Sequence, residues 1–517
     1  MCYRLSLASS TPRSFFIGIL LSSGAAFADD DLDGRVHHDD AGGSSIGGVA
    51  SVESGQRDAP DEGAGVSDGS SASESSAPWK ESAGFHFGSY GRTRLATDLR
   101  GGGPKYANIA SHGSRLESAP YLEMEFRETQ YPSEKNSDLR VRVVSTVAFD
   151  GDPFHYTGQW SSNIALRNLF VDVQGVGYEG LTLWTGARMY RGDDIYLLDF
   201  WPLDNLNTVG GGAILDVGKG TRIQAHAGSN RLINSSFQYQ ARVVPSTDHF
   251  GTDLAVTLDR PRTIASAKLT QFTSGFTAPK GFKASLYGEA HFLASGTQEV
   301  GGNLDRPDSK LPSDYGFVVG AQATPYGFGD RYGHAHLFVR YATGIAALGE
   351  LASPSKINAD KKVDASEFVA ALAGNYETGR FGIMWGAYLR YFDGSMGAEY
   401  SDSKYWEGTI IARPQLYVSD HFSFGAEASY QYKNRKVLDD KGEHNVPSAF
   451  RLSLLPIISP SGWGGYNRPI IYGVYTATIR NEAARNSYAD EDPRSARRVE
   501  HYLGLHAEWW FNSSSYP

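Results

Sequence analysis

Cysteine, methionine and long apolar runs are all scarce in this chain of 517 residues. It contains one cysteine, Cys2, and five methionines. A single cysteine cannot form an intramolecular disulfide, so a disulfide-stapled scaffold is excluded. No stretch of roughly 18 consecutive apolar residues follows the N-terminal region, and the mean hydropathy is −0.37, which excludes a helical membrane protein. A soluble fold remains, as does a membrane barrel whose alternating strands average out to a polar composition.

Basic charge is also in short supply. The chain has 48 Lys and Arg against 58 Asp and Glu, and a formal net charge of −10, which argues against a nucleic-acid surface. No P-loop, hydrolase elbow or Cys/His metal cluster is present, and the pairs His37-His38 and His334/His336 lack partners at metal-ligand spacing. We therefore expect no nucleic-acid partner, no metal or other cofactor, and no enzymatic activity.

The N-terminal region has the pattern of a secretory signal followed by a polar linker. Arg4 and Arg13 supply positive charge, residues 15–21 form a short apolar run, and A-F-A at 26–28 offers a cleavage site. Residues 29–80 are rich in Ser, Gly, Ala and acidic residues, which predicts a disordered acidic tether. The predicted division is a signal peptide at 1–28, the tether at 29–80, one folded domain at 84–511 and a C-terminal extension at 512–517.

Alternating strands dominate the folded domain, and residues 502–511 show the pattern most clearly. They read Y-L-G-L-H-A-E-W-W-F, in which every second side chain is apolar and the others are polar, small or amphipathic. A period of two predicts a strand with one apolar and one wet face. Parity places Trp509 and Phe511 towards lipid and Trp510 towards a lumen. A strand of about ten residues with aromatics at its end is what a transmembrane β-barrel requires.

The same alternation recurs from residue 84 onward between turns rich in glycine, asparagine and proline. Runs at 121–126, 139–143 and 181–190 place charged and aromatic side chains opposite the apolar face. At roughly 20–25 residues per strand with its connection, the domain holds about 16–20 strands, enough for a water-filled channel. Residues 190–215 do not alternate cleanly yet are apolar, which predicts a loop folded inward to narrow the pore. The predicted fold class is all-β, a transmembrane antiparallel β-barrel with an inward-folded constriction loop.

Four stretches of this domain carry a family resemblance. They are F-H-F-G-S-Y-G-R at 85–92, Y-L-E at 121–123 after Arg115, L-W-T-G-A-R-M-Y-R-G-D-D-I-Y-L-L-D-F-W at 183–201, and the final strand ending in Trp510-Phe511. In this order they resemble the maltoporins, which are trimeric sugar-specific porins. The resemblance implies 18 strands and a homotrimer in the outer membrane of a Gram-negative bacterium. It also implies passive diffusion of maltose- and maltodextrin-like oligosaccharides, small solutes and ions.

The resemblance further implies which residues bind the sugar. In maltoporins a spiral of aromatic rings, the greasy slide, guides the sugar past flanking polar groups. The matching slide residues are Tyr90, Tyr121 and Trp510, with Trp160 contributed to a neighbouring subunit. The matching polar partners are Arg92, Arg115, Glu123, Arg167, Asp199 and Asp204. Trp201 falls at the narrowest point, Asp194 lies earlier in the same loop, and Arg188 is a further pore-facing charge. Rings suit the C–H face of a sugar, and charged groups suit its hydroxyls.

The chain departs from the maltoporin pattern at several positions. His334 and Val418 stand where slide aromatics are expected, and Tyr417 beside Val418 is a substitute if the register shifts locally. Gly192 and Tyr196 stand where the family has a loop arginine and a loop histidine. These departures leave the identity of the sugar open.

Simpler roles remain open for the same residues and for the whole protein. Tyr90 and Trp510 could be girdle aromatics at the membrane interface, and Arg92, Arg115 and Arg188 could be wall charges that pair across the lumen. The protein could be a general porin, a porin for sucrose or an acidic sugar, a structural or adhesive barrel, or a soluble periplasmic sandwich. Besides a sugar, the expected partners are outer-membrane lipid and the barrel-assembly machinery, whose terminal aromatic signal Phe511 resembles.

Overall fold

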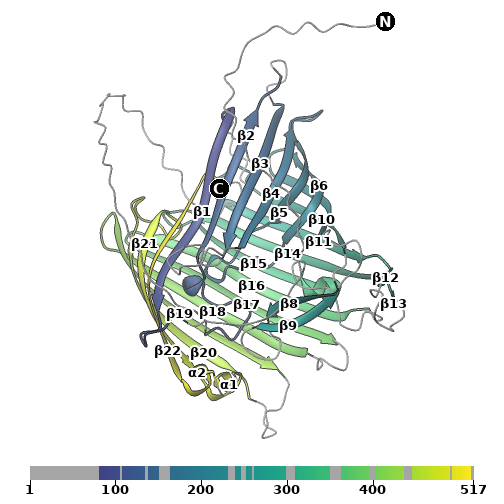
Figure 1. Ribbon diagram of the computed structural model, residues 1–517. Coiled ribbons are helices and arrows are strands. Elements are labelled where there is room, and N and C mark those ends of the chain that lie inside the picture. The colour runs from purple at the N-terminus through teal and green to yellow at the C-terminus, as the bar shows by residue number, and fades with distance from the viewer. Residues whose placement is uncertain are drawn as a thin grey trace, which may run out of the picture. The chain divides into compact units, whose positions relative to one another are not determined.

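The computed structural model describes residues 81–513, apart from 105–106, 134–137, 151–162, 231–238, 246–251, 259–260, 299–308, 350–361, 396–402, 436–444 and 489–491. Eighteen strands form one antiparallel sheet, and the pairing of β22 with β1 closes it into a barrel (Figure 1). This confirms the predicted barrel and its strand number. In ring order the strands are β1 Gly84–Thr97, β2 Tyr121–Gln130, β3 Arg140–Asp150, β4 Asn163–Gln174, β5 Leu181–Arg191, β6 Asn205–Val217, β7 Thr221–Asn230, β10 Arg262–Phe272, β11 Gly281–Leu293, β14 Asp314–Phe328, β15 Gly333–Gly344, β16 Asp364–Thr378, β17 Phe381–Ser395, β18 Ser403–Tyr417, β19 Phe422–Arg435, β20 Ser448–Ile458, β21 Ile470–Arg480 and β22 Val499–Phe511.

Two small hairpins and a few short helical turns lie in the connections. The hairpins are β8 Tyr239–Pro245 with β9 Thr252–Leu258, and β12 Gly296–Gln298 with β13 Ser309–Leu311. The helical turns are η1 Arg115–Glu117, η3 Tyr196–Leu198, η4 Ile345–Leu348, α1 Glu482–Arg485 and α2 Pro493–Ala496. Within the described part of the chain, no helix is long and apolar enough to cross a membrane.

Side chains alternate between the two faces of the wall, apart from local bulges in β4 and β14. In β20, Phe450, Leu452 and Leu454 are exposed on the outside, whereas Arg451 and Ser453 are 2% exposed on the inside. An exposed apolar band around a polar interior is the arrangement of a barrel that faces lipid and encloses water. The predicted alternation of residues 502–511 is confirmed in β22, where the even-numbered side chains point inward.

Connections of unequal length distinguish the two ends of the barrel. At one end, β6 joins β7 through residues 218–220, and β16 joins β17 through residues 379–380. At the other end the connections are longer, for example residues 98–120 between β1 and β2. In outer-membrane barrels the short turns are periplasmic and the long loops extracellular. The end that carries residues 218–220 is therefore the periplasmic end.

Several of the predicted segment boundaries fall outside the residues that the structure describes. The predicted signal peptide at 1–28, the tether at 29–80 and most of the extension at 512–517 lie outside the described residues. The predicted inward loop at 190–215 was drawn too long, because β6 begins at Asn205 and only residues 192–204 leave the wall.

Candidate functional site

Residues 192–204, here called the constriction loop, leave the wall after β5 and turn into the lumen. Ile195 and Phe200 form an isolated antiparallel bridge that closes the loop, and Asp199 turns the chain with a positive φ of 51°. Ile195 and Leu203 are at most 1% exposed and belong to one buried cluster with side chains of the wall. Burying a large apolar side chain contributes roughly 1.5–3 kcal/mol, so apolar packing anchors this loop.

The wall is shaped to receive the constriction loop. A Cβ atom on Gly386 of β17 would lie 2.5 Å from Cγ2 of Ile195, so the missing side chain at this inward-facing position allows the loop to approach. Asp193 anchors the start of the loop through an ion pair of 2.5 Å with Lys283 of β11. The loop is therefore held against the wall by both shape and charge.

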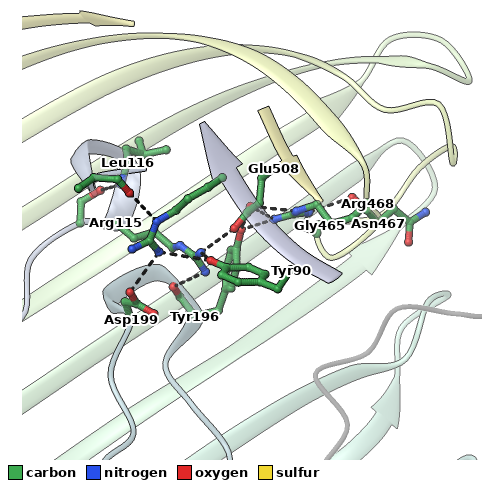
Figure 2. A network of polar contacts seen from close by, with 12 residues as sticks. Tyr90, Arg115, Leu116, Tyr196, Asp199, Gly465, Asn467, Arg468 and Glu508 are labelled. Atoms are coloured by element: carbon green, nitrogen blue, oxygen red, sulfur yellow. Dashed lines mark hydrogen bonds and ion pairs between the residues drawn. The ribbon is translucent and has the colours of Figure 1, made fainter. Parts of the chain in front are cut away.

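Glu508 on the inward face of β22 is the centre of a buried polar network (Figure 2). Its side chain is 3% exposed and accepts hydrogen bonds from Arg115 at 2.6 Å, Arg468 at 2.9 Å and the Tyr196 hydroxyl at 2.6 Å. Arg115 also donates to the Tyr90 hydroxyl at 2.8 Å. Burial raises the pKa of Tyr196 despite the two arginines, so its phenol stays protonated and donates to Glu508. This network joins five separate parts of the chain inside the barrel: β1, the β1–β2 connection, the constriction loop, the β20–β21 connection and β22.

A second charged pair lies beside this network and faces the open lumen. Arg92 of β1 forms an ion pair of 3.3 Å with Asp199, and its guanidinium lies 5.6 Å from the ring centre of Tyr121. Burial pushes the pKa of Asp199 upward, but Arg115 and Arg92 outweigh this and hold it below its usual value. Asp199 is therefore ionised at neutral pH.

Tyr121 belongs to a third polar group on the neighbouring strands. Its hydroxyl donates to Glu123 at 2.5 Å and accepts from Arg167 at 2.5 Å. Arg167 of β4 also forms an ion pair with Glu123 of β2. The Tyr121 hydroxyl therefore lies between the Glu123 carboxylate and the Arg167 guanidinium at the wall of the constriction.

Aromatic rings form a continuous path through the same region. Successive ring centres are 5.8 Å apart for Tyr121 and Tyr90, 6.5 Å for Tyr90 and Trp510, 6.0 Å for Trp510 and Tyr196, 5.5 Å for Tyr196 and Tyr466, and 5.8 Å for Tyr466 and His334. These separations are within the range of favourable aromatic contacts. The path runs from β2 across the constriction loop to β15, with charged groups along its length.

The sequence model of the LamB porin family matches residues 85–511 of this chain. This chain belongs to the LamB porin family. It is an outer-membrane porin of a Gram-negative bacterium. No curated protein sequence matches it.

Solved outer-membrane channels are similar to this chain at low identity and low TM-score. The channel DcaP of Acinetobacter baumannii is 11% identical with a TM-score of 0.42, over 84% of this chain and 99% of that chain. OccAB1 of Acinetobacter baumannii is 11% identical with a TM-score of 0.42, over 83% and 96%. OmpT of Vibrio cholerae in its trimer form is 12% identical with a TM-score of 0.37, over 83% and 100%. Likeness at this level carries no information about substrate.

The remaining predicted site residues of the LamB porin lie apart from the Glu508 network. Trp201 lies on the constriction loop, where the guanidinium of Arg191 is 3.9 Å from its ring centre. Asp204 ends the loop and forms an ion pair of 2.8 Å with Lys268 of β10. Trp160 lies outside the described residues.

Arg188 serves the wall rather than the constriction. It points inward from β5, and its guanidinium lies 4.7 Å from the ring centre of Phe170, 5.2 Å from that of Trp184 and 5.5 Å from that of Tyr190. These cation–π contacts form a separate cluster on the wall.

The structure clarifies the departures from the maltoporin pattern. His334 faces the lumen and contacts Tyr466, whereas Val418 is 46% exposed in the turn after β18. Tyr417 is instead the inward-facing ring, 2% exposed and stacked at 5.6 Å on Trp463. The regular alternation of β18 therefore places Tyr417 inside without a local shift of register.

Gly192 has a steric reason in this LamB porin. A Cβ atom there would lie 2.0 Å from the Asp204 carboxylate and 2.9 Å from the Lys268 ammonium. A longer side chain would displace this ion pair, so the position does not accommodate the arginine of the maltoporin pattern.

Residues 459–469, here called the periplasmic segment, were missed by the sequence interpretation. This connection joins β20 to β21 at the periplasmic end and contributes Tyr466 to the aromatic path and Arg468 to the Glu508 network. Its sequence, S-P-S-G-W-G-G-Y-N-R-P, reads as an ordinary turn apart from its two aromatics. Its unusual length at the short-turn end is the one signal that could have revealed it.

Proposed function

We propose that this LamB porin lets maltose- and maltodextrin-like oligosaccharides, with small solutes and ions, diffuse passively across the outer membrane. One observation carries the proposal: the partly exposed rings of Tyr121, Trp201 and Trp510 each lie against an arginine guanidinium at the constriction. A pyranose stacks its C–H face on such rings while its hydroxyls bond to carboxylates and guanidinium groups. Weak contacts in series allow a sugar to enter readily and leave again, as conduction requires.

The protein would act as a passive channel without catalysis or cofactor. Among the described residues, no group of three or more His, Cys, Asp or Glu could hold a metal ion. We also propose a homotrimer, in which Trp160 reaches the pore mouth of a neighbouring subunit as the maltoporin resemblance implies. Chemical cross-linking in native membranes tests the assembly, and a monomer-only pattern would contradict it.

The pore residues are tested by sugar block of ion current in planar bilayers. We expect Tyr121→Ala and Trp201→Ala to weaken maltodextrin block about 2- to 10-fold each, since one aromatic contact contributes about 0.5–1.5 kcal/mol. Trp406→Ala is the matched control, because Trp406 is 36% exposed on the outer face of β18. Unchanged sugar affinity in both pore variants would contradict the assignment of Tyr121 and Trp201 to the sugar-binding path.

A porin selective for an acidic sugar is the second candidate. Three arginines, Arg92, Arg115 and Arg468, converge near the constriction, and His334 stands in place of a flat apolar ring. Titrating one channel with maltodextrins, sucrose and uronic-acid oligosaccharides separates the candidates. Stronger block by the acidic sugars favours the second candidate, and no block by any sugar indicates a general porin. Sugar uptake that survives deletion of residues 29–80 argues against an adhesive role built on the tether.

A further inference from the structure

The outer face of β15 to β19 carries an unusual arrangement of small and large side chains. The pairing registers place Ala370, Leu389, Gly408 and Tyr432 side by side in one cross-strand row. The next row towards the periplasm contains Leu372, Ala387, Ile410 and Tyr430. Small residues therefore alternate with large ones along and across the strands.

This alternation creates an apolar groove of about 360 Å³ in the lipid-facing wall. Ala370, Ala387 and Gly408 form its floor, and Ile410 and other large side chains of the two rows form its walls. The backbone keeps the floor low, because a Cβ atom on Gly408 would lie 2.6 Å from the carbonyl oxygen of Tyr388. The groove is therefore a built feature of the sheet rather than a gap between mobile side chains.

The groove lies within the hydrocarbon layer, close to its outer boundary. The next row towards the extracellular end contains Phe368, Tyr391 and Trp406, and the Tyr391 and Trp406 rings are 4.8 Å apart. One row further, Asp393 and Lys404 form an ion pair of 3.2 Å. Aromatic side chains mark the membrane interface, and the ion pair marks the water beyond it. The groove is therefore at the depth of acyl chains in the outer leaflet.

The position around the ring separates the groove from the proposed subunit contact. In the ring of 18 strands, β17 at the centre of the groove lies opposite β4. Residues 151–162, which contain Trp160, directly precede β4. A trimer that uses that side of the barrel leaves the face of β16 to β18 towards bulk lipid.

We propose that this groove holds one acyl chain of an outer-leaflet lipid as a specific binding site. A single flexible hydrocarbon chain can fill a narrow apolar groove, whereas the bulky side chains of a second barrel would meet the protruding Leu372 and Ile410. The aromatic row above the groove leaves the lipid headgroup at the level of Trp406. The bound chain completes the wall where the sheet has only small side chains.

A photoreactive lipid tests the site on the full-length porin. The protein is reconstituted into vesicles that contain phosphatidylethanolamine with a diazirine in one acyl chain, irradiated, digested and mapped by mass spectrometry. We expect labelling of Leu389, Ile410 and Tyr432 to exceed that of the outward residues of β10 and β11, which also face bulk lipid, several-fold. Uniform labelling around the barrel, or no labelling at the groove because another copy covers it, overturns the proposal.

Filling the groove provides the second arm of the test. Ala370→Leu combined with Ala387→Leu should abolish the local excess of labelling, while substitution of an exposed outward alanine of β7, Ala225→Leu, should leave it unchanged. Heat-modifiable migration verifies that each variant has formed a barrel. If the double variant does not fold, the milder Ala387→Val should reduce the excess at least twofold. An excess that persists in a folded, filled variant overturns the proposal.

Discussion

The constriction loop and the periplasmic segment enter the barrel from opposite ends and meet inside it, and they differ in how far apolar packing and polar contacts hold each of them. The constriction loop buries Ile195 and Leu203 in the apolar cluster of the lumen. The periplasmic segment contributes Tyr466 to the same cluster and adds polar contacts, including Arg468 to Glu508 at 2.9 Å and the Gly465 amide to Glu377 at 2.8 Å. Apolar packing tolerates small shifts, whereas a buried ion pair depends on both partners. The same narrow site therefore has one adaptable wall and one that depends on buried carboxylates, chiefly Glu508.

Removing that carboxylate should have the largest effect. Glu508→Gln leaves Arg115 and Arg468 buried without their acid, and breaking such a pair typically costs about 3–5 kcal/mol. We expect the periplasmic segment to detach, single-channel conductance to rise and maltodextrin block to weaken at least tenfold. Planar-bilayer recording measures both quantities.

Glu367→Gln is the matched control for this prediction. Glu367 is 3% exposed on β16 and also pairs with two arginines, Arg340 and Arg390, but all three lie on the barrel wall. Its loss should leave the two inward segments in place. Equal changes in conductance for both variants would show that Glu508 has no special role in joining the segments.

Disturbing the apolar anchor should have a smaller effect. Gly386→Val inserts a side chain where Ile195 already lies, and overpacking of this kind costs about 1–3 kcal/mol. We expect noisier current and a several-fold weaker sugar block, because the loop carries Tyr196 and Trp201. Gly425→Val is the control, since a Cβ atom there would have its nearest neighbour at 3.6 Å. Equal noise in both variants would contradict apolar anchoring by the wall.

The two segments also differ in how far the sequence revealed them. Broken alternation with high apolar content predicted the constriction loop, but its end was placed within β6. There the wall is Gly210-Gly211-Gly212, and a Cβ atom on Gly212 would lie 2.6 Å from the Trp184 indole nitrogen. Three glycines in a row carry no side chains, so the sequence shows no alternation of apolar and polar residues there. The structure needs glycine at Gly212 because the Trp184 ring occupies the space beside it. The barrel and the inward face of β22 were predicted correctly because alternation is a local signal, whereas the strand number of 18 came from the family resemblance.

The periplasmic segment could not be recognised in the same way. Its partners Glu377, Tyr196 and Glu508 are distant in the sequence, and Ser, Pro and Gly are typical of any turn. Such contacts form only when the barrel closes and brings distant residues together, so no local sequence pattern indicates them. The resemblance gave several pore residues their inward face, but whether they bind sugar remains a prediction.

The contribution of the periplasmic segment to the sugar path can be measured at one ring. Tyr466→Ala removes the ring that lies between Tyr196 and His334. We expect sugar block to weaken about 2- to 10-fold at unchanged conductance, because one aromatic contact contributes about 0.5–1.5 kcal/mol. Tyr466→Phe retains the ring and should behave as the parent. Weaker block in the phenylalanine variant as well would assign the effect to the hydroxyl instead of the ring.

The smallest expected effect is a titration that belongs to the constriction loop alone, because the periplasmic segment contains no acid. Burial raises the pKa of Asp194 to about 7; Arg115 opposes this shift, while Asp199 and Asp193 add to it. The group is neutral below that pH, so its contribution to stability declines as pH rises from the unfolded value of about 3.9 towards 7. We expect cation selectivity, measured as reversal potential in a salt gradient, to increase as pH rises through about 7. Asp194→Asn should abolish this step, whereas Asp199→Asn should move it to lower pH because one of the charges that raise the pKa is gone. A step near neutral pH that survives in Asp194→Asn would show that another group controls the selectivity of the constriction.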